Sequence, residues 1–382
     1  MASVPLVHRR PALAEGYVDA LEGRGILDAR SGLFLAGPRR TGKSTFLRED
    51  MLPVLNSRQH AVVYVDLWSD RAALPASLIA AAIKKALAQY EGSIKKFAKG
   101  AGLDKVNVFG ALSLNLNSLE MPPNVTLADA LEALQMLAGH PVTIVVDEAQ
   151  HALSSKEGID AMFALKAARD HLNQGSAVGQ KLYLIFTGSN QDKLSRLVRK
   201  KNQPFYGSSV SKFPLLDRGF SDAYTEHINS MLAQGNQFEK DDIWKAFQLV
   251  GQRPEMLRSI TSEIALSSGV HDFKALLEDG AEAFREQIWG DMESEFNALS
   301  EMQQAVLVRL IDVGNTYEPF TEKSLAAYGN YAGRTVTTSE VQAALTALRE
   351  KNLIWQAAYG DYALEDESMA LWYKTMRKAK IT

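Results

Sequence analysis

The chain contains no cysteine among its 382 residues. Disulfide bonds, thiolate nucleophiles and zinc sites built on cysteine are therefore excluded. The sequence also has no apolar run close to the roughly 20 residues that cross a bilayer. Its N-terminal stretch up to Gly16 lacks the apolar centre of a signal peptide. Together these absences predict a cytoplasmic protein without a membrane partner.

An excess of positive charge is missing as well. The 42 Lys and Arg residues against 45 Asp and Glu residues give a net charge of −3. No global positive field draws the chain onto nucleic acid, although a local basic patch would still do so. With 46% hydrophobic and 23% charged residues, the composition is that of a globular protein with a sizeable core. The length predicts two or three domains.

The stretch GPRRTGKST fits the pattern G-x-x-x-x-G-K-[ST] of a phosphate-binding loop. An apolar, strand-like run at 32–36 precedes it and an apolar helix follows it. The glycines let backbone N–H groups point at phosphate oxygens. The lysine places its charge on the outer phosphates, and the serine hydroxyl binds Mg²⁺. The residues predicted to bind a nucleoside triphosphate are Gly37, Pro38, Arg39, Arg40, Thr41, Gly42, Lys43, Ser44 and Thr45, with Ser44 also a metal ligand.

Two carboxylates follow directly on the apolar run at 141–146. At the end of a parallel strand, Asp147 can hold Mg²⁺ through water, and Glu148 can orient and deprotonate the attacking water. The buried run at 182–187 ends in Gly188, Ser189 and Asn190. A polar side chain there is expected beside the γ-phosphate. The sequence therefore predicts hydrolysis as well as binding.

Strand patterns alternate with helical ones over the first 216 residues, which predicts an α/β fold with a three-layer parallel sheet. The second strand is expected at 61–67 and the last at 213–216. Alternating leucines in the stretch 106–119 predict a half-buried hairpin, inserted at the sheet edge or on a face. Such a strand either docks a partner or merely covers the core.

The remainder of the chain is mainly helical. An all-α lid is expected over 217–296, after an ATPase core at 1–216. Over 297–382, three helices precede two strands joined at Gly360 and Asp361, which is a hairpin signal. We interpret this order as a winged helix, whose third helix is expected to be capped by Thr338 and Ser339.

The third helix of that module offers few groups that would hold DNA. Gln342, Thr346 and Arg349 can contact bases or phosphates, but Glu340 and Glu350 lie among them. Basic and acidic residues nearly balance over 297–382. Such a balance gives little of the excess positive charge that binding to DNA phosphates requires. Binding of double-stranded DNA and docking against protein both remain open.

The segments GPRRTGKST, VTIVVDEAQ and LIFTGSN, in this order, resemble those of the AAA+ ATPases. More narrowly, they resemble the archaeal-type branch close to the STAND signalling NTPases and the replication-initiation ATPases. The resemblance covers nearly the whole chain and implies ATP as the nucleotide. No base-reading N-K-x-D-like motif accompanies the loop, so this expectation rests on the resemblance alone. It also implies that Asn190 is the sensor 1 residue, with Ser189 as the alternative.

Two further segments extend the resemblance. The stretch GQRPEML at 251–257 is similar to the G-x-x-P motif of the family's lid, which implies that Arg253 reaches the phosphates as sensor 2. The alternative is a helix N-terminus with a solvent-exposed arginine. The stretch from Val7 to Arg10 resembles a short motif that packs near the adenine, which makes Arg9 a nucleotide-binding candidate.

One segment departs from the family pattern. Relatives often carry a PLYGR-like segment, whereas residues 204–208 read PFYGS, with Ser208 in place of the arginine. An arginine finger would have to come from Arg196 or Arg199. The resemblance then implies a mainly monomeric protein that hydrolyses ATP slowly and oligomerises only with ATP and a partner.

These expectations give one leading function and two alternatives. The leading function is a regulatory switch in which Mg-ATP controls assembly or the binding of a protein partner. The first alternative is a nucleotide-controlled DNA-binding regulator, similar to those of replication initiation or transposition, with slow hydrolysis. The second, a scaffold with a structural nucleotide, is disfavoured because Glu148 is present.

Overall fold

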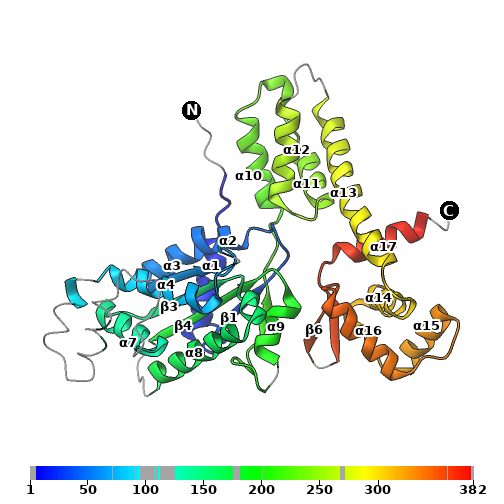
Figure 1. Ribbon diagram of the computed structural model, residues 1–382. Coiled ribbons are helices and arrows are strands. Elements are labelled where there is room, and N and C mark those ends of the chain that lie inside the picture. The colour runs from blue at the N-terminus through cyan, green and yellow to red at the C-terminus, as the bar shows by residue number, and fades with distance from the viewer. Residues whose placement is uncertain are drawn as a thin grey trace. The chain divides into compact units, whose positions relative to one another are not determined.

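The computed structural model describes residues 6–70, 72–90, 92–94, 108, 111, 125–174, 181–199, 201–266, 272–358 and 360–379. The described residues form two compact units (Figure 1). The sheet unit comprises residues 9–37 and 43–213, and the helical unit comprises residues 1–8, 38–42 and 214–382. The stretch 106–119, where we expected a hairpin, lies outside the described residues apart from Val108 and Ala111.

The sheet unit is built on five parallel strands in the order β2-β3-β4-β1-β5. Their bounds are β1 Leu33–Ala36, β2 Ala61–Asp66, β3 Val142–Asp147, β4 Leu182–Gly188 and β5 Val210–Lys212. Strands β1, β3 and β4 are buried along their whole length. This is expected of parallel strands that are covered on both faces.

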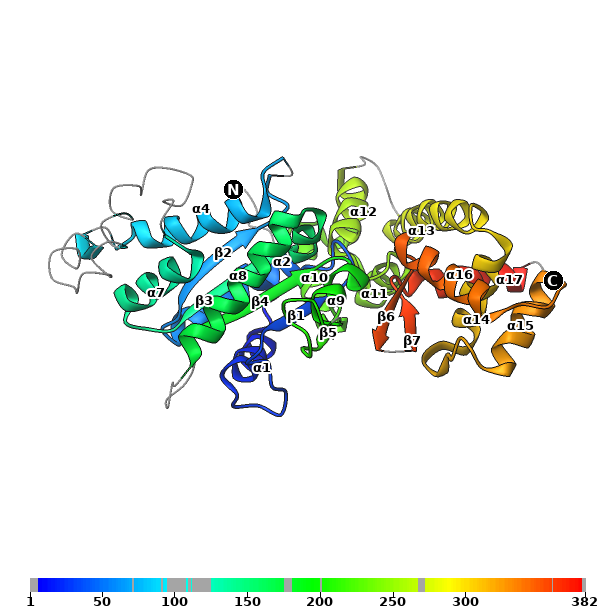
Figure 2. The ribbon, with the colours of Figure 1, turned by 60° about the horizontal axis from the view of Figure 1, so that its bottom comes forward.

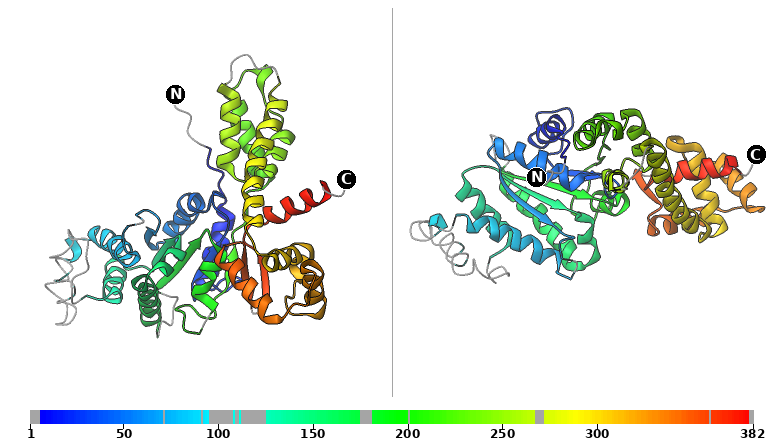
Figure 3. Two further views of the ribbon diagram at one scale, coloured as in Figure 1. Left: turned by 45° about the vertical axis from the view of Figure 1, so that its right-hand side comes forward. Right: turned by 90° about the horizontal axis from the view of Figure 1, so that it is seen from above.

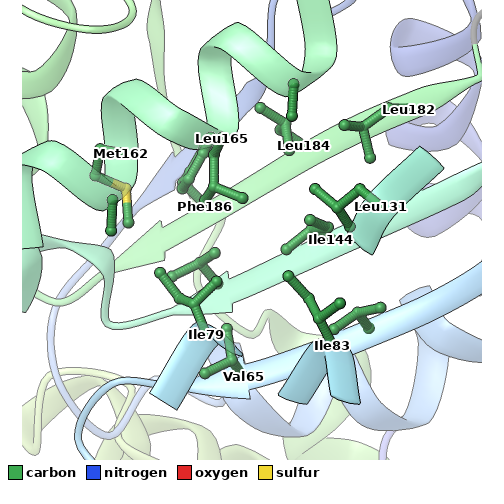
Figure 4. Close-up of a cluster of buried hydrophobic side chains, with 14 of the residues drawn as sticks. Val65, Ile79, Ile83, Leu131, Ile144, Met162, Leu165, Leu182, Leu184 and Phe186 are labelled. Carbon is green, nitrogen blue, oxygen red and sulfur yellow. The ribbon is translucent and has the colours of Figure 1, made fainter. Parts of the chain in front are cut away.

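Helices cover both faces of this sheet (Figure 2). One face carries α4 Pro75–Ala88, α7 Leu127–Ala138 and α8 Lys156–Asn173. Figure 4 shows Ile79, Ile83 and Leu165 of these helices packed against the strands. The other face carries α1 Pro11–Glu22 and a helical run made of α2 Lys43–Phe46, the π-helical turn η1 Leu47–Met51 and α3 Leu52–Ser57. The expected three-layer parallel α/β architecture is confirmed.

The last strand lies three residues earlier than expected. It spans Val210–Lys212, not 213–216. The Phe213 N–H still donates to the Ala36 carbonyl at 2.6 Å, but Pro214 has no N–H with which to continue the ladder. The segment is apolar because Phe213 is buried in the core of the sheet unit and Leu216 in that of the helical unit.

The helical unit begins with a helical bundle (Figure 3). Its helices are α10 Arg218–Asn229, α11 Lys240–Leu249, α12 Pro254–Leu266 and α13 Phe273–Asn297. Phe220, Phe247, Leu257 and Leu277 fill its core. The last turns of α13 pack into a second core, through Phe296 among others. The boundaries at 216 and 296 stay predictions, and α13 runs past the second without a break.

The second core joins four helices and a hairpin, together with the last turns of α13. Its elements are α14 Glu301–Val313, α15 Glu322–Ala332, α16 Thr338–Glu350, β6 Ile354–Ala358, β7 Asp361–Leu364 and α17 Ser368–Ala379. Strands β6 and β7 are antiparallel. This is the element order that we expected, and the winged-helix assignment itself stays a prediction.

The expected cap of α16 was wrong by one residue. Thr337, not Thr338 or Ser339, is the N-cap, and it shares three hydrogen bonds with Glu340. The acidic side chain three residues on selects the earlier threonine, because it completes a capping box. Among the described residues, no helix combines the length and the hydropathy that a bilayer crossing requires.

Candidate functional site

The sheet order determines where the predicted site residues of the sheet unit meet. Strand β4 lies between β1 and β3, and all three are parallel. Their carboxyl ends therefore share one edge, where ligands bind in open α/β sheets. Gly37 follows β1, Asp147 and Glu148 end β3, and Ser189 follows β4.

The phosphate-binding loop turns sharply at this edge. Gly42 has φ +85°, a conformation that suits glycine. Lys43 is 6% exposed, and its Nζ donates to the Gly37 carbonyl at 2.7 Å. A Cβ on Gly37 would lie 3.2 Å from the Phe213 Cβ, so the loop begins where the backbone approaches that side chain closely. A buried ammonium group at a glycine-rich turn is what an anion site requires.

The other predicted loop residues lie in varied surroundings. Thr41 is buried, and its hydroxyl donates to the Pro38 carbonyl at 2.8 Å. Arg40 forms an ion pair with Glu255 at 3.4 Å, with both side chains more than half exposed. Such a pair adds little stability. Arg39 and Thr45 are exposed, and Ser44 is half-buried. Contact of these residues with nucleotide or metal stays a prediction.

Asp147 is held firmly at the end of β3. Its carboxylate is 1% exposed and accepts hydrogen bonds from the Tyr64 hydroxyl at 2.9 Å, the Glu148 N–H at 3.1 Å and the Thr187 hydroxyl. A carboxylate has about four acceptor positions. Among the described residues these three donors leave a place for one more, such as a metal-bound water.

A magnesium ion fits this donor set. Mg²⁺ prefers hard oxygen ligands, keeps several waters and uses one or two protein oxygens together with phosphate. Asp147 and the Ser44 hydroxyl are oxygen donors of that kind. Within the described parts of the chain, no cluster of three or more His, Cys, Asp or Glu side chains could hold a metal by itself. A metal here would therefore depend on nucleotide and water ligands.

Charge accumulates at the same edge. Asp66 pairs in register with Asp147 on the neighbouring strand. Burial, together with the charges of Asp147 and Glu148, raises the pKa of Asp66, although a backbone hydrogen bond from Trp68 lowers it in part. Burial and the Asp147 charge also raise the pKa of Tyr64. The phenol therefore stays protonated and donates to Asp147.

Glu148 is oriented by neighbouring donors. Its backbone has φ +55°, which is unusual outside glycine and frequent at functional sites. Its Oε2 accepts from the Ser189 hydroxyl at 2.7 Å, the Ser189 N–H at 3.3 Å and the Gln150 amide. Asn190 instead accepts the Lys193 N–H at 2.7 Å, at the start of α9 Gln191–Arg199. Ser189, the alternative sensor 1 candidate, thus contacts Glu148 through both its hydroxyl and its N–H group.

The predicted arginines form pairs of their own. Arg9 donates to the buried Asp50 at 2.8 Å. In the helical unit, Arg253 is 14% exposed and pairs with Asp366 at 2.8 Å, so it is not the solvent-exposed arginine of the alternative interpretation.

The two finger candidates on α9 differ in exposure. Arg196 pairs with Asp192 at 3.0 Å and is 41% exposed. The terminal guanidinium nitrogens of Arg199 are buried. Arg196 is therefore the better placed of the two to reach another molecule.

Sequence reasoning missed Tyr64, Thr187 and Gln150 at this edge. Thr187 lies on β4 and Ser189 follows directly after the strand, two positions further along, and their hydroxyls bond to Asp147 and Glu148 respectively. That spacing was a usable signal. Tyr64 gave none, because its contact depends on β2 lying beside β3.

No protein-family model matches the chain, and neither does any curated protein. Among solved structures, the chain is similar to a Walker-type ATPase of Pyrococcus abyssi, with 18% identity, a TM-score of 0.57 and 96% of each chain covered. It is also similar to the ADP form of the ORC2 protein of Aeropyrum pernix, with 14% identity, a TM-score of 0.57, and 100% of this chain and 97% of that chain covered. Identities at this level show the fold. The chain thus has the fold of the archaeal-type AAA+ P-loop ATPases, as its motifs led us to expect.

Proposed function

We propose that the protein binds ATP with Mg²⁺ and hydrolyses it. The observation that carries this proposal is the pair Asp147 and Glu148. They are held by the hydroxyls of Thr187 and Ser189 at the sheet edge where Gly37 and Lys43 begin and end the glycine-rich turn. An anion site and an oriented pair of carboxylates on one edge are what phosphate hydrolysis requires. The ADP form of the ORC2 protein supports an adenine nucleotide.

Each residue of the site would have a separate role in nucleotide binding or hydrolysis. Lys43 and the loop amides would bind the β- and γ-phosphates, and Ser44 and Asp147 would hold the metal ion. When bound, Mg²⁺ supplies charge neutralisation at the phosphate oxygens. Tyr64 and Thr187 fix the Asp147 carboxylate by hydrogen bonds. Glu148 orients a water molecule and accepts its proton.

We also propose that the ATPase is a regulatory switch, slow by itself, that assembles with a partner when ATP is bound. Support comes from Ser208, which stands at the arginine position of the PLYGR-like segment that residues 204–208 resemble, and from the exposed Arg196. A second cation stabilises the charge of the transition state in related chemistry. Arg196 would supply it to a neighbouring molecule.

Nucleotide-controlled DNA binding is the second candidate. The outward side of α16 lines a shallow depression with Ser339, Gln342 and Thr346, and amide and hydroxyl groups can read base edges. Glu350 lines the same depression. An acidic group there opposes phosphate contacts, so we favour a protein partner on this face. DNA affinity that falls steeply with salt would reverse this preference.

Calorimetric titration of the full chain with Mg-ATP tests the binding site. The natural protein should bind, and Lys43→Ala should lose binding while its unfolding temperature stays unchanged. Arg30→Ala is the control and should bind ATP normally, because it removes an exposed cation of the sheet unit that is not among the predicted nucleotide-binding residues. Unchanged ATP affinity in Lys43→Ala would show that the loop does not bind the phosphates.

A further inference from the structure

Gln150 is a buried glutamine in the short 3-10 helix η2 Ala149–Ser154, two residues after Glu148. Its side chain is 6% exposed. Its Nε2 donates to Glu148 Oε2 and lies 3.2 Å from the Ser189 hydroxyl, to which it also donates. One amide group therefore joins the proposed base to the hydroxyl that orients it.

The orientation of the Gln150 amide is fixed by chemistry. A reversed amide would place its carbonyl oxygen against the Glu148 carboxylate, and two acceptors without a proton repel each other. Oε1 therefore points away from Glu148, toward Gly188, where an added Cβ would lie 2.6 Å from it. The absence of a side chain at position 188 leaves room for this amide.

This arrangement has an energetic cost. Gln150 Oε1 is buried and has no hydrogen-bond partner among the described residues. A buried acceptor without a partner has lost its hydrogen bonds to water and gained none in exchange, which destabilises the folded state. Packing alone would favour an apolar side chain at this position, because such a side chain leaves no acceptor unsatisfied. The amide is explained by what its N–H group does at Glu148.

The donors around Glu148 also distinguish its two oxygens. Oε2 receives the Ser189 N–H, the Ser189 hydroxyl and the Gln150 amide. An oxygen with two lone pairs is saturated by three donors. The proton of an attacking water must then go to Oε1 of Glu148.

We propose that Gln150 is a positioning residue of the hydrolytic site. Its amide fixes the Ser189 hydroxyl and Glu148 Oε2, so that Glu148 Oε1 faces the water. This inference rests on the proposed role of Glu148 as the general base. Gln150 acts through Glu148 and Ser189 and does not itself touch the nucleotide.

Steady-state hydrolysis of Mg-ATP by the full chain separates positioning from a merely structural role. Gln150→Ala should lower kcat about tenfold, the value of one hydrogen bond to a charged group, and leave KM within about twofold. Gly188→Ala keeps the glutamine but displaces its amide, so it should lower kcat in the same way. The control is Gln304→Ala in the helical unit, which removes a glutamine amide bonded to the Phe296 carbonyl and should change neither constant.

The double variant gives the decisive comparison. Once the amide is gone, a methyl group at position 188 displaces nothing, so Gln150→Ala with Gly188→Ala should be no slower than Gln150→Ala alone. Additive losses, an unchanged kcat in Gln150→Ala, or equal changes in kcat and KM would overturn the inference. If Gln150→Ala fails to fold, Gly188→Ala decides by the split between kcat and KM.

Glu148→Gln in the same assay tells the two possible failures apart. Full turnover in Glu148→Gln would remove the proposed function of Glu148, and the positioning role with it. Lost turnover in Glu148→Gln together with full turnover in Gln150→Ala would remove only the role of Gln150.

Discussion

Two buried polar clusters lie at opposite ends of strands β2 and β3. At the amino end, His60 contacts the Thr143 hydroxyl at 2.7 Å and Glu22 at 3.2 Å. At the carboxyl end, Tyr64 contacts Asp147 at 2.9 Å. We refer to them as the His60 cluster and the Asp147 cluster. Both satisfy buried polar groups by hydrogen bonds, but they treat charge differently.

In the His60 cluster, charges of opposite sign are paired. Glu22 pairs with both Arg24 and Arg58, and Arg58 also bonds to Asp19 at 2.7 Å. Two carboxylates thus meet two guanidinium groups. Such a network holds α1, α3 and the sheet together, and it leaves little charge for a ligand.

In the Asp147 cluster, like charges are gathered. Asp66, Asp147 and Glu148 lie together. The Arg48 guanidinium, on the adjoining helical run, attracts the carboxylates of Asp66 and Asp147 electrostatically. Neutral donors fix these carboxylates: hydroxyls, backbone N–H groups and one amide. Neutral donors orient a carboxylate without cancelling its charge, so the negative field remains available to a metal ion and a proton. We infer that the His60 cluster stabilises the fold, whereas the Asp147 cluster takes part in the proposed hydrolysis.

Among the substitutions around Glu148, the largest effect is expected from Asp147→Asn. A carboxylate that holds Mg²⁺ through water belongs to the metal's outer shell, where substitutions cost about 10–100-fold in metal affinity or activity. The unfolding midpoint should stay the same or rise, because one of three clustered charges is removed. Hydrolysis measured against Mg²⁺ concentration tests this. The control is Asp66→Asn at the neighbouring strand end, which should keep activity; equal losses in both variants would contradict the assignment of Asp147.

Glu22→Gln should show the opposite pattern. The substitution removes the Glu22 carboxylate, which is 10% exposed and pairs with Arg58. The free energy of unfolding should therefore fall by about 2 kcal/mol, the value of a hydrogen bond to a charged group. The kcat of hydrolysis should not change. Urea unfolding and the ATPase assay on the same preparation measure both quantities. A fall in kcat without a loss of stability would show that the His60 cluster is not purely structural.

The pH dependence of stability should be traceable to His60. Burial, opposed by the hydrogen bond to Glu22, lowers the pKa of His60 below its ordinary value. The unfolded chain therefore binds the proton more readily, and the His60 contribution to stability is present above pH about 6.5 and lost as pH falls toward the folded-state pKa. His60→Gln should reduce the pH dependence of the unfolding midpoint between about pH 7 and 5. An identical slope in both proteins would assign the effect to another group.

The smallest effect is expected from Arg48→Ala. Arg48 is exposed, and its guanidinium carbon lies 5.7 Å from the centre of the Tyr64 ring. Loss of an exposed cation near the Asp147 cluster should lower stability by about 0.5 kcal/mol at low salt, and high salt should erase the difference. Unfolding at two ionic strengths tests this. A loss as large as that of Glu22→Gln would mean that the Asp147 cluster is compensated after all.

The sequence predicted those parts of the site that are encoded locally. The loop from Gly37 to Thr45 and the pair Asp147 and Glu148 each lie within one short segment, and apolar runs marked four of the five strands. The layers followed from the alternation of strands and helices. The family fold was accessible for the same reason.

Other parts depend on distant segments and were not predictable. The bond from Tyr64 to Asp147 joins residues on neighbouring strands that are 83 positions apart in the chain. Asp366 meets Arg253 from 113 positions away. The last strand was placed wrongly because burial in two different cores made the segment 213–216 as apolar as a strand.

The most direct test of the comparison is Glu148→Gln, measured for turnover and for stability in one experiment. The substitution keeps the size of the side chain and one acceptor oxygen but removes the base. Phosphate release should fall by roughly 10²–10⁴-fold, the usual contribution of a positioned general base, while ATP still binds. The unfolding midpoint should be unchanged or higher, because a like charge is removed beside Asp66 and Asp147. Undiminished phosphate release with a lowered midpoint would contradict the account, because Glu148 would then belong to the scaffold and Asp66 would be the next candidate for the base.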